Sequence, residues 1–421
     1  MTAAADPPPC IGCGAPLTRT VIDLGPTPPC EDFLTADRLA EPEIYYPLDV
    51  RICDACLLVQ LPVYIPPNHI FREYAYFSSF SDSWVQHAAR LVETAIERQG
   101  MSPGALVIEA ASNDGYLLQH VQSHGLRAVG IEPARNIAEV ARARGITTVN
   151  EFLSEETAEA VVAEHGQADW VVANNVFAHV PAINDFTAGL ATLLKPGGLL
   201  SIEVAYLVRL IAGAEFDTIY HEHFAYHTVH AARTVLARQG LRILDVEELP
   251  THGGSIRLWV VHDADPRPTT DGVDAIIDSE RALGMDRPTG YGGLVGKVER
   301  IKLDLLAYLV AQRQAGRRVV GYGAPGKANT LLNHCGIKAD LIEYLVDRNP
   351  YKHGRFTPGA RIPIHPPERL LEDRPDVIVI LPWNLRDEIT AQLTATLPWG
   401  PDLVVPIPRL EVTTLPRHGT E

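Results

Sequence analysis

Two pairs of cysteines near the N-terminus constrain the fold of this chain more than any other feature. Cys10 and Cys13 form one Cys-x-x-Cys pair, and Cys53 and Cys56 form a second. A tight turn lets each pair present two thiolates to one metal ion, and four thiolates complete a tetrahedral zinc site. Such a site is closed, so we expect zinc to stabilise a small ribbon and to take no part in chemistry.

Composition and charge narrow the class of protein. The chain has 421 residues, of which 46% are hydrophobic and 21% charged, as in a folded protein of two or three domains. A net charge of −16 argues against a nucleic-acid partner. The sequence has no apolar run long enough to cross a membrane and no secretory start, so we expect a cytoplasmic protein with reduced thiols. Its oligomeric state is left open, and a monomer is compatible with the sequence.

The middle of the chain alternates strand and helix patterns. Residues 106–110 are a run of buried-strand type, residues 112–115 form a turn, and a helix is expected from Tyr116 onward. Further strands are expected over 168–176 and 197–207. This alternation predicts a doubly wound α/β sheet that binds its ligand at the carboxyl ends of the strands.

The turn after the first of these strands has the wrong residues for a dinucleotide. An alanine stands where the first glycine of Gly-x-Gly-x-x-Gly is expected, which leaves less room for a pyrophosphate. A nucleoside without phosphates, such as S-adenosylmethionine, suits this turn better, and Glu132 would hold its ribose hydroxyls. The predicted cofactor residues are Glu109, Asn113, Asp114, Gly115, Glu132, Phe152 and Asn174. Phe152 is equally compatible with plain core packing.

Histidines gather in one segment, FDTIYHEHFAYHTVH at 216–230. An extended backbone would put Tyr220 and Glu222 on one face, whereas a helix from residue 223 would stack His223 on His227. Three interpretations stay open for this segment: a second metal site, a packed and hydrogen-bonded cluster, and an acid/base cluster. Histidine titrates near neutrality, so we favour the last.

Four motifs downstream of the cysteine pairs carry a resemblance to a known family. EAASNDGYL, GIEPA, NNVFAHV and LKPGGLL resemble a class I methyltransferase. More narrowly, the chain resembles the sugar-nucleotide C-methyltransferases of deoxysugar biosynthesis, from about Cys10 to beyond Asn384. The resemblance implies a zinc-binding domain over 1–68, a methyltransferase domain that uses S-adenosylmethionine over 69–245, and a Rossmann-like substrate domain over 246–421.

The same resemblance implies a reaction and its residues. Carbon has no lone pair, so a base must first remove the proton beside the ketone of a 4-keto sugar and leave an enolate. The family pattern Tyr-x-Glu-His matches Tyr220, Glu222 and His223, with His223 as the base, and a family histidine matches His179. A structural role for His179 stays open, and His221 and His227 are weaker candidates for catalysis. The implied substrate-binding residues are Tyr74, Tyr76, Ser78, Ser79, His252, Arg257, Lys327, Asn349 and Lys352.

The C-terminal third adds a second nucleotide-like pattern. A hairpin is expected over 241–263, and Gly321, Gly323 and Gly326 then spell Gly-x-Gly-x-x-Gly, with Asp347 ending the next strand. The pattern is compatible with a domain that holds the nucleotide diphosphate of the substrate, with an NADPH site, or with a fold kept for packing.

These observations lead to one expected function and its rivals. We expect methylation, at C3, of a 4-keto-6-deoxysugar linked to thymidine diphosphate (dTDP), with S-adenosylmethionine as the donor. The rivals are a bifunctional enzyme that also reduces the 4-keto group with NADPH, a methyltransferase acting on oxygen or on a small acid, and a non-catalytic zinc-ribbon module.

Overall fold

The computed structural model describes residues 6–73 and 77–417, which form two compact units. Both units are built from more than one stretch of chain. The first contains Met1–Arg19, Arg51–Val208 and Glu222–Gly290, and the second contains Thr20–Val50, Arg209–His221 and Tyr291–Glu421. None of the helices described is both long and apolar enough to cross a membrane.

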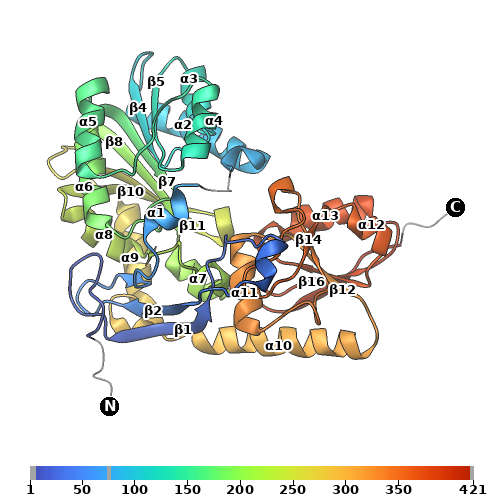
Figure 1. Ribbon diagram of the computed structural model, residues 1–421. Helices are drawn as coiled ribbons and strands as arrows, with labels where there is room; N and C mark the ends of the chain where they lie inside the picture. Colours follow the sequence, from blue (N-terminus) through green and yellow to red (C-terminus); the bar gives the residue numbers. More distant parts are fainter. Residues whose placement is uncertain (1–5, 74–76, 418–421) are drawn as a thin grey trace. The chain divides into compact units, whose positions relative to one another are not determined.

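A seven-stranded sheet in the order β10-β11-β8-β7-β4-β5-β6 is the centre of the first unit (Figure 1). The neighbours from β6 to β8 pair in parallel, whereas β11 is antiparallel to both β8 and β10. The chain runs outward from β4 to β6 and then returns to β7, so the ligand crevice lies between β4 and β7. The strands are β4 (Leu106–Ala110), β5 (Arg127–Ile131), β6 (Thr147–Val149), β7 (Ala168–Asn174), β8 (Leu194–Ala205), β10 (Leu241–Leu249) and β11 (Ser255–His262).

Helices cover both faces of this sheet. One apolar core packs under α2 and α3, and the other packs under α5, α6, α8 and α9; Figure 1 shows α5 and α6 on the side of the sheet away from α2 and α3. The helices are α1 (Pro67–Phe71), α2 (Asp82–Gln99), α3 (Leu118–Ser123), α4 (Arg135–Ala143), α5 (Glu155–His165), α6 (Ile183–Leu193), α8 (Val229–Ala237) and α9 (Asp271–Ala282).

Local sequence explains where several of these helices begin. The hydroxyl of Ser81 accepts a hydrogen bond from the backbone N–H of Trp84 at the start of α2, and Ser154 caps α5 in the same way. Thr228 caps α8 through the backbone N–H of Ala231. These side chains satisfy N–H groups that have no partner within the helix, so each helix starts where its cap stands.

The N-terminal residues form a small sheet in the order β1-β2-β3-β9. Its strands are β1 (Arg19–Thr27), β2 (Tyr46–Ile52), β3 (Val59–Gln60) and β9 (Ala225–Tyr226). In the first unit, β3 pairs antiparallel with β9, so the segment after the second cysteine pair lies beside residues that follow the histidine-rich motif.

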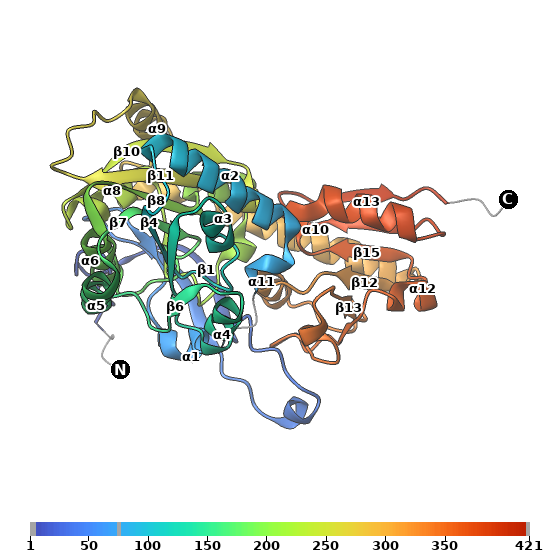
Figure 2. The same cartoon turned by 90° about the horizontal axis from the view of Figure 1, so that it is seen from above.

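The second unit contains a six-stranded sheet in the order β14-β13-β12-β15-β16-β17, parallel except for β17. Its helices α10 (Val295–Gln314) and α13 (Arg386–Thr396) lie on opposite sides of the sheet (Figures 1 and 2). The strands are β12 (Val319–Tyr322), β13 (Leu345–Val346), β14 (Ile364–His365), β15 (Val377–Ile380), β16 (Asp402–Val405) and β17 (Glu411–Thr414). The remaining helices are α7 (Leu207–Gly213), which runs into this unit from the first, α11 (Gly326–Cys335) and α12 (Arg369–Asp373).

Candidate active site

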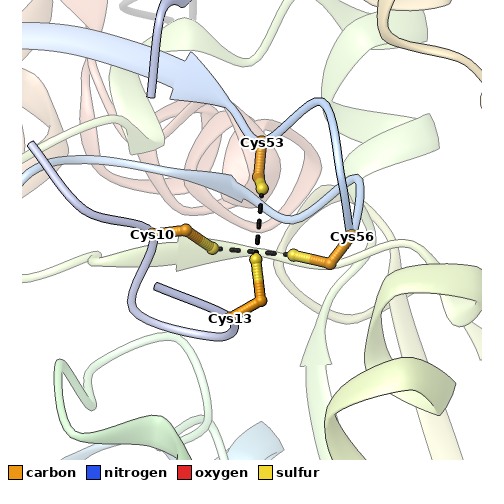
Figure 3. A group of neighbouring side chains, drawn as sticks. All are labelled: Cys10, Cys13, Cys53 and Cys56. Atoms are coloured by element: carbon orange, nitrogen blue, oxygen red, sulfur yellow. Dashed lines mark hydrogen bonds between the residues drawn. The ribbon is translucent and has the colours of Figure 1, made fainter. Parts of the chain in front are cut away.

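The four paired cysteines converge in the first unit (Figure 3). Their sulfurs all lie within 4.8 Å of one another, with Cys10 Sγ 3.5 Å from Cys56 Sγ and Cys13 Sγ 3.4 Å from Cys53 Sγ. A zinc–sulfur bond of about 2.3 Å requires sulfurs about 3.8 Å apart at the corners of a tetrahedron. The cluster therefore fits zinc, and four thiolate ligands leave no position for a substrate.

Polar side chains surround these cysteines. The Gln60 amide donates to Cys10 Sγ at 3.1 Å, and the carbonyl of Gly12 accepts from Arg238 at 2.5 Å and from Asn184 at 3.0 Å. A hydrogen bond from Cys56, and a further one from Gln60, lower the pKa of Cys10 to about 4. The same hydrogen bond raises the pKa of Cys56, so the first thiolate of this pair forms at Cys10, and zinc binding would displace the proton that remains on Cys56.

The turn that follows β4 carries three of the predicted cofactor residues, Asn113, Asp114 and Gly115. Asn113 and Gly115 both have positive φ angles, 49° and 80°, and a Cβ at Gly115 would lie 2.8 Å from a side-chain carbon of Ile146. Only glycine fits at that position, because both the φ angle and the space exclude a side chain. Asn174, at the end of β7, is 7% exposed, and neither its amide nitrogen nor its oxygen has a partner within the described chain. Such orphaned polar atoms fit a bound polar ligand.

Two acids stand at this crevice. Burial raises the pKa of Glu109 well above its usual value, and the charge of Glu132 adds to this. Burial raises the pKa of Glu132 to about 7, although its carboxylate accepts from the backbone N–H groups of Asn113 at 2.9 Å and Ala134 at 2.8 Å. A carboxylate has about four lone-pair positions, so Glu132 keeps capacity for ribose hydroxyls.

The predicted residues before α2 lie against the same turn. The backbone N–H of Ser78 donates to Asn113 at 2.9 Å, and the hydroxyl of Ser79 donates to the carboxylate of Asp114. Tyr74 and Tyr76 lie outside the described residues. Phe152 has the guanidinium of Arg72 above its ring, 5.1 Å from the centroid.

The histidine-rich segment is neither one extended strand nor a helix from residue 223, since α8 begins only at Val229. His227 stacks on Phe177 at 4.5 Å and bonds to its carbonyl at 3.3 Å, and burial lowers the pKa of His227 to about 4. In the second unit, His221 bonds to the carbonyl of Tyr46 at 3.1 Å. Both histidines are therefore packed and hydrogen-bonded. Across the described residues, the four cysteines are the one group that brings three or more metal-ligating side chains together, which argues against a second metal site.

His223 has a different environment. It is partly exposed, and its ring contacts that of His179 edge-on with 4.6 Å between centroids. Burial lowers the pKa of His179 to about 4, opposed by a hydrogen bond to the backbone of Glu222. His179 is therefore neutral near pH 7 and places no positive charge beside His223. Tyr220, the first residue of the motif, belongs to the second unit.

Comparison with known proteins identifies the family. Family models match residues 10–71 as a zinc binding domain, 84–246 as a methyltransferase domain and 250–408 as a C-methyltransferase C-terminal domain. The C-methyltransferase NovU of Streptomyces niveus is 36% identical over 403 residues, which are 96% of each chain. The chain belongs to the C-methyltransferase family. The resemblance and the α/β fold class predicted from the sequence are thereby confirmed, and S-adenosylmethionine is the methyl donor of this domain.

More distant relatives match only part of this C-methyltransferase. The ubiquinone biosynthesis O-methyltransferase of Burkholderia pseudomallei (strain 1710b) is 24% identical over 212 residues, 47% of this chain and 86% of its own. The structure of the magnesium protoporphyrin IX methyltransferase (ChlM) from Synechocystis PCC 6803 with bound SAM aligns with 43% of this chain and 82% of its own, at 21% identity and a TM-score of 0.32.

A buried ion network in this C-methyltransferase was not anticipated from the sequence. Glu203, which is 0% exposed, accepts from His87 at 2.9 Å, from Arg257 at 2.8 Å and from Thr251 at 3.0 Å. Burial opposes ionisation, yet the hydrogen bond from His87 and the charge of Arg257 lower the pKa of Glu203. The family resemblance implies that Arg257 contacts the substrate. In the structure its guanidinium is instead bonded to the buried Glu203. A lone acid within the apolar run of β8 was the available sequence clue to this network.

His252 stands at the tip of the β10–β11 hairpin with a positive φ of 55°. Its ring bonds to the amide of Asn175 at 3.2 Å and contacts Trp84 at 4.9 Å. Because Asn175 directly follows β7, the hairpin places His252 at the carboxyl end of the sheet, as a ligand-contacting residue requires.

In the second unit, the three predicted basic and amide residues have intramolecular partners. Lys327 bonds to the side chain of Asn384 and lies 4.3 Å from the centroid of the Trp383 ring. Asn349 accepts from the backbone N–H of Tyr351 at 3.0 Å, and Lys352 donates to the carbonyl of Ala324 at 2.7 Å. Burial lowers the pKa of Lys327, opposed by the nearby Asp217 and Glu215 carboxylates. Those acids weaken the case for an anion at Lys327.

The glycine-rich turn of the second unit is covered from within the unit. The Glu31 carboxylate accepts from the backbone N–H of Gly326, at the amino end of α11, where a dinucleotide would place its pyrophosphate. A Cβ at Gly326 would lie 2.5 Å from Glu31 Oε1. Asp347, the expected ribose acid, accepts from the backbone N–H groups of Ala324 at 2.6 Å and Asn349 at 2.7 Å. Carboxylates of the second unit thus already occupy the backbone N–H groups of this turn that a phosphate would need.

The pKa of Glu132 makes cofactor binding pH-dependent. An ionised carboxylate accepts ribose hydroxyls better than a protonated one, so affinity for S-adenosylmethionine should rise as pH rises through about 7. We expect the Kd to fall about tenfold from pH 6 to pH 8 in isothermal titration. Glu132→Gln should weaken binding by roughly 10- to 100-fold and remove the pH dependence. The exposed Glu139→Gln on α4 is the control, and an equal pH profile in Glu132→Gln would contradict the assignment.

Proposed function

We propose that this C-methyltransferase methylates C3 of a 4-keto-6-deoxysugar linked to dTDP, through an enolate. The observation that supports this most is the pairing of a partly exposed His223 with a neutral His179 in the unit that contains the cofactor crevice. Methylation of carbon requires a base, whereas many transfers to oxygen or nitrogen do not, and this pair supplies one.

In the proposed mechanism, His223 Nε2 or Nδ1 takes the proton from C3. His179 has no charge near neutral pH, so no like charge opposes the imidazolium that forms on His223. Following the family pattern, Tyr220 stabilises the enolate oxygen, and the buried Glu222 orients its neighbours. S-adenosylmethionine supplies the electrophilic methyl group. Glu132, Asn174 and the turn at Asn113–Gly115 hold the donor, and His252 contacts the sugar.

We favour a transferase without ketoreductase activity. The position for a dinucleotide pyrophosphate at Gly326 is taken by the Glu31 carboxylate, and both oxygens of Asp347 are bonded to backbone N–H groups. In this proposal the second unit serves the nucleotide of the substrate. Asn349 and Lys352 would need to exchange their present partners to contact it.

A labelled methyl donor tests the function. We expect incubation with methyl-labelled S-adenosylmethionine and a dTDP-linked 4-keto-6-deoxysugar to give a product with one methyl group on C3, seen by mass spectrometry and NMR. Added NADPH should leave the product unchanged. A label on oxygen would contradict C-methylation, and a new C4 hydroxyl that appears only with NADPH would restore the bifunctional alternative.

A further inference from the structure

One polar side chain joins the cysteine cluster to the segment that carries His223. Gln60 is 0% exposed and is the second residue of β3, between the apolar residues Val59 and Leu61. Its amide nitrogen donates to Cys10 Sγ at 3.1 Å and to the carbonyl of Leu58 at 3.2 Å, and its oxygen accepts from the backbone N–H of Ile11 at 2.8 Å. If the amide were flipped, its oxygen would face Cys10 Sγ and the Leu58 carbonyl, which are both acceptors. These partners therefore determine the orientation of the amide.

The backbone of the same residue pairs with the motif. Gln60 lies opposite Ala225 in the β3–β9 pairing, and the N–H of Leu61 donates to the carbonyl of Phe224 at 3.0 Å. The N–H groups of Phe224 and Ala225 both donate to the carbonyl of Ala178, at 2.7 and 3.1 Å. Residues 224 and 225 are thus held between β3 and the residue before His179. His179 directly follows Ala178 and His223 directly precedes Phe224, so the contact between the two rings lies beside these hydrogen bonds.

We propose that Gln60 is a positioning residue that couples the cysteine-bound zinc to His223. A zinc-bound thiolate still accepts an N–H donor, and the metal fixes the position of the Cys10 sulfur, so the Gln60 amide is held in one place when zinc is present. The fixed Gln60 side chain anchors β3, β3 anchors β9, and β9 places His223 against His179. The zinc cluster then maintains the geometry of the base without contacting substrate. The consequence for catalysis rests on the proposed role of His223, whereas the structural coupling does not.

Two substitutions test the coupling. Gln60→Met keeps the length of the side chain but removes its donors, and Gln60→Glu keeps the shape while placing a carboxylate beside the thiolate. We expect both variants to release zinc to a chromophoric chelator about 10- to 100-fold faster. In zinc-saturated protein, hydrogen exchange should speed up in a peptide spanning residues 222–228, while peptides from β7 stay protected. The kcat should fall about tenfold with unchanged affinity for S-adenosylmethionine. Gln167→Met, which loses hydrogen bonds to the carbonyls of Thr192 and Leu194, is the control.

The outcomes separate this inference from the proposed function. A zinc-saturated Gln60 variant with wild-type protection of residues 222–228 and wild-type kcat would overturn the coupling. If neither variant folds, gradual zinc removal from the wild-type chain replaces them. We then expect residues 222–228 to lose protection before β7, and a simultaneous loss in both would contradict the proposal. Zinc release and hydrogen exchange involve no sugar, so coupling without C-methylation would refute the function alone.

Discussion

His223→Asn should lower kcat by roughly 10²- to 10⁴-fold and leave the Kd for S-adenosylmethionine nearly unchanged. Asparagine keeps a polar side chain of similar reach but cannot take a proton from carbon. His223 is partly exposed and lies beside His179, so its replacement should disturb packing little. Steady-state kinetics with isothermal titration of the methyl donor measures the two effects separately.

The same variant should fail to exchange the C3 hydrogen of the sugar with deuterium from solvent. Enolate formation is reversible, so the wild-type enzyme should exchange that hydrogen when a non-transferable analogue of the donor is bound. His124→Asn, at the end of α3, is the matched control, because within the described residues the ring of His124 bonds to its sequence neighbours His120 and Ser123. Wild-type turnover in His223→Asn would remove His223 as the base.

Cys53→Ser should abolish zinc binding and destabilise the first unit by about 4 kcal/mol or more, seen as a lowered Tm in calorimetry. The effect is large because Cys10, Cys53 and Cys56 are buried in the same apolar core as the central strands of the seven-stranded sheet. The loss of one thiolate therefore removes both the metal and the packing that depends on it. Metal analysis should find one zinc per wild-type chain and none in the variant.

Cys335→Ser provides the comparison. Cys335 is equally buried but lies in α11 of the second unit, outside the group of four. The Cys335→Ser variant should keep its zinc. A chelator should therefore lower the Tm of this variant and the Tm of the wild type by the same amount. A metal-free Cys53→Ser variant with the same Tm as the zinc-bound wild type would show that zinc has no structural role.

Much of the fold follows from local patterns in the sequence. The expected strand at 106–110 is β4, and the hairpin expected over 241–263 is β10 and β11. Runs of apolar residues and the spacing of glycines are properties of neighbouring residues, so they survive folding unchanged. The cysteine group also follows from spacing, because each pair is a local turn and zinc chemistry demands four ligands.

Local sequence patterns do not predict the environment of each histidine in the segment 216–230. Its sequence left three interpretations open, and the structure packs His221 and His227 against carbonyl groups while it brings His223 to His179. Nothing near these residues in the sequence distinguishes them. Their environments depend on strand pairing with β3 and on contacts with residues more than forty positions away.

The sequence alone determined the class of sheet and predicted the group of four cysteines and a crevice at the carboxyl ends of the strands, because these depend on spacing and on alternation along the chain. Only the tertiary structure decided that Glu31 covers the glycine-rich turn, that Glu203 engages Arg257, and that Gln60 joins the cysteines to the histidine motif. Each of these contacts joins residues distant in sequence. Such contacts form only when the register of the strands and the packing of the units have been set.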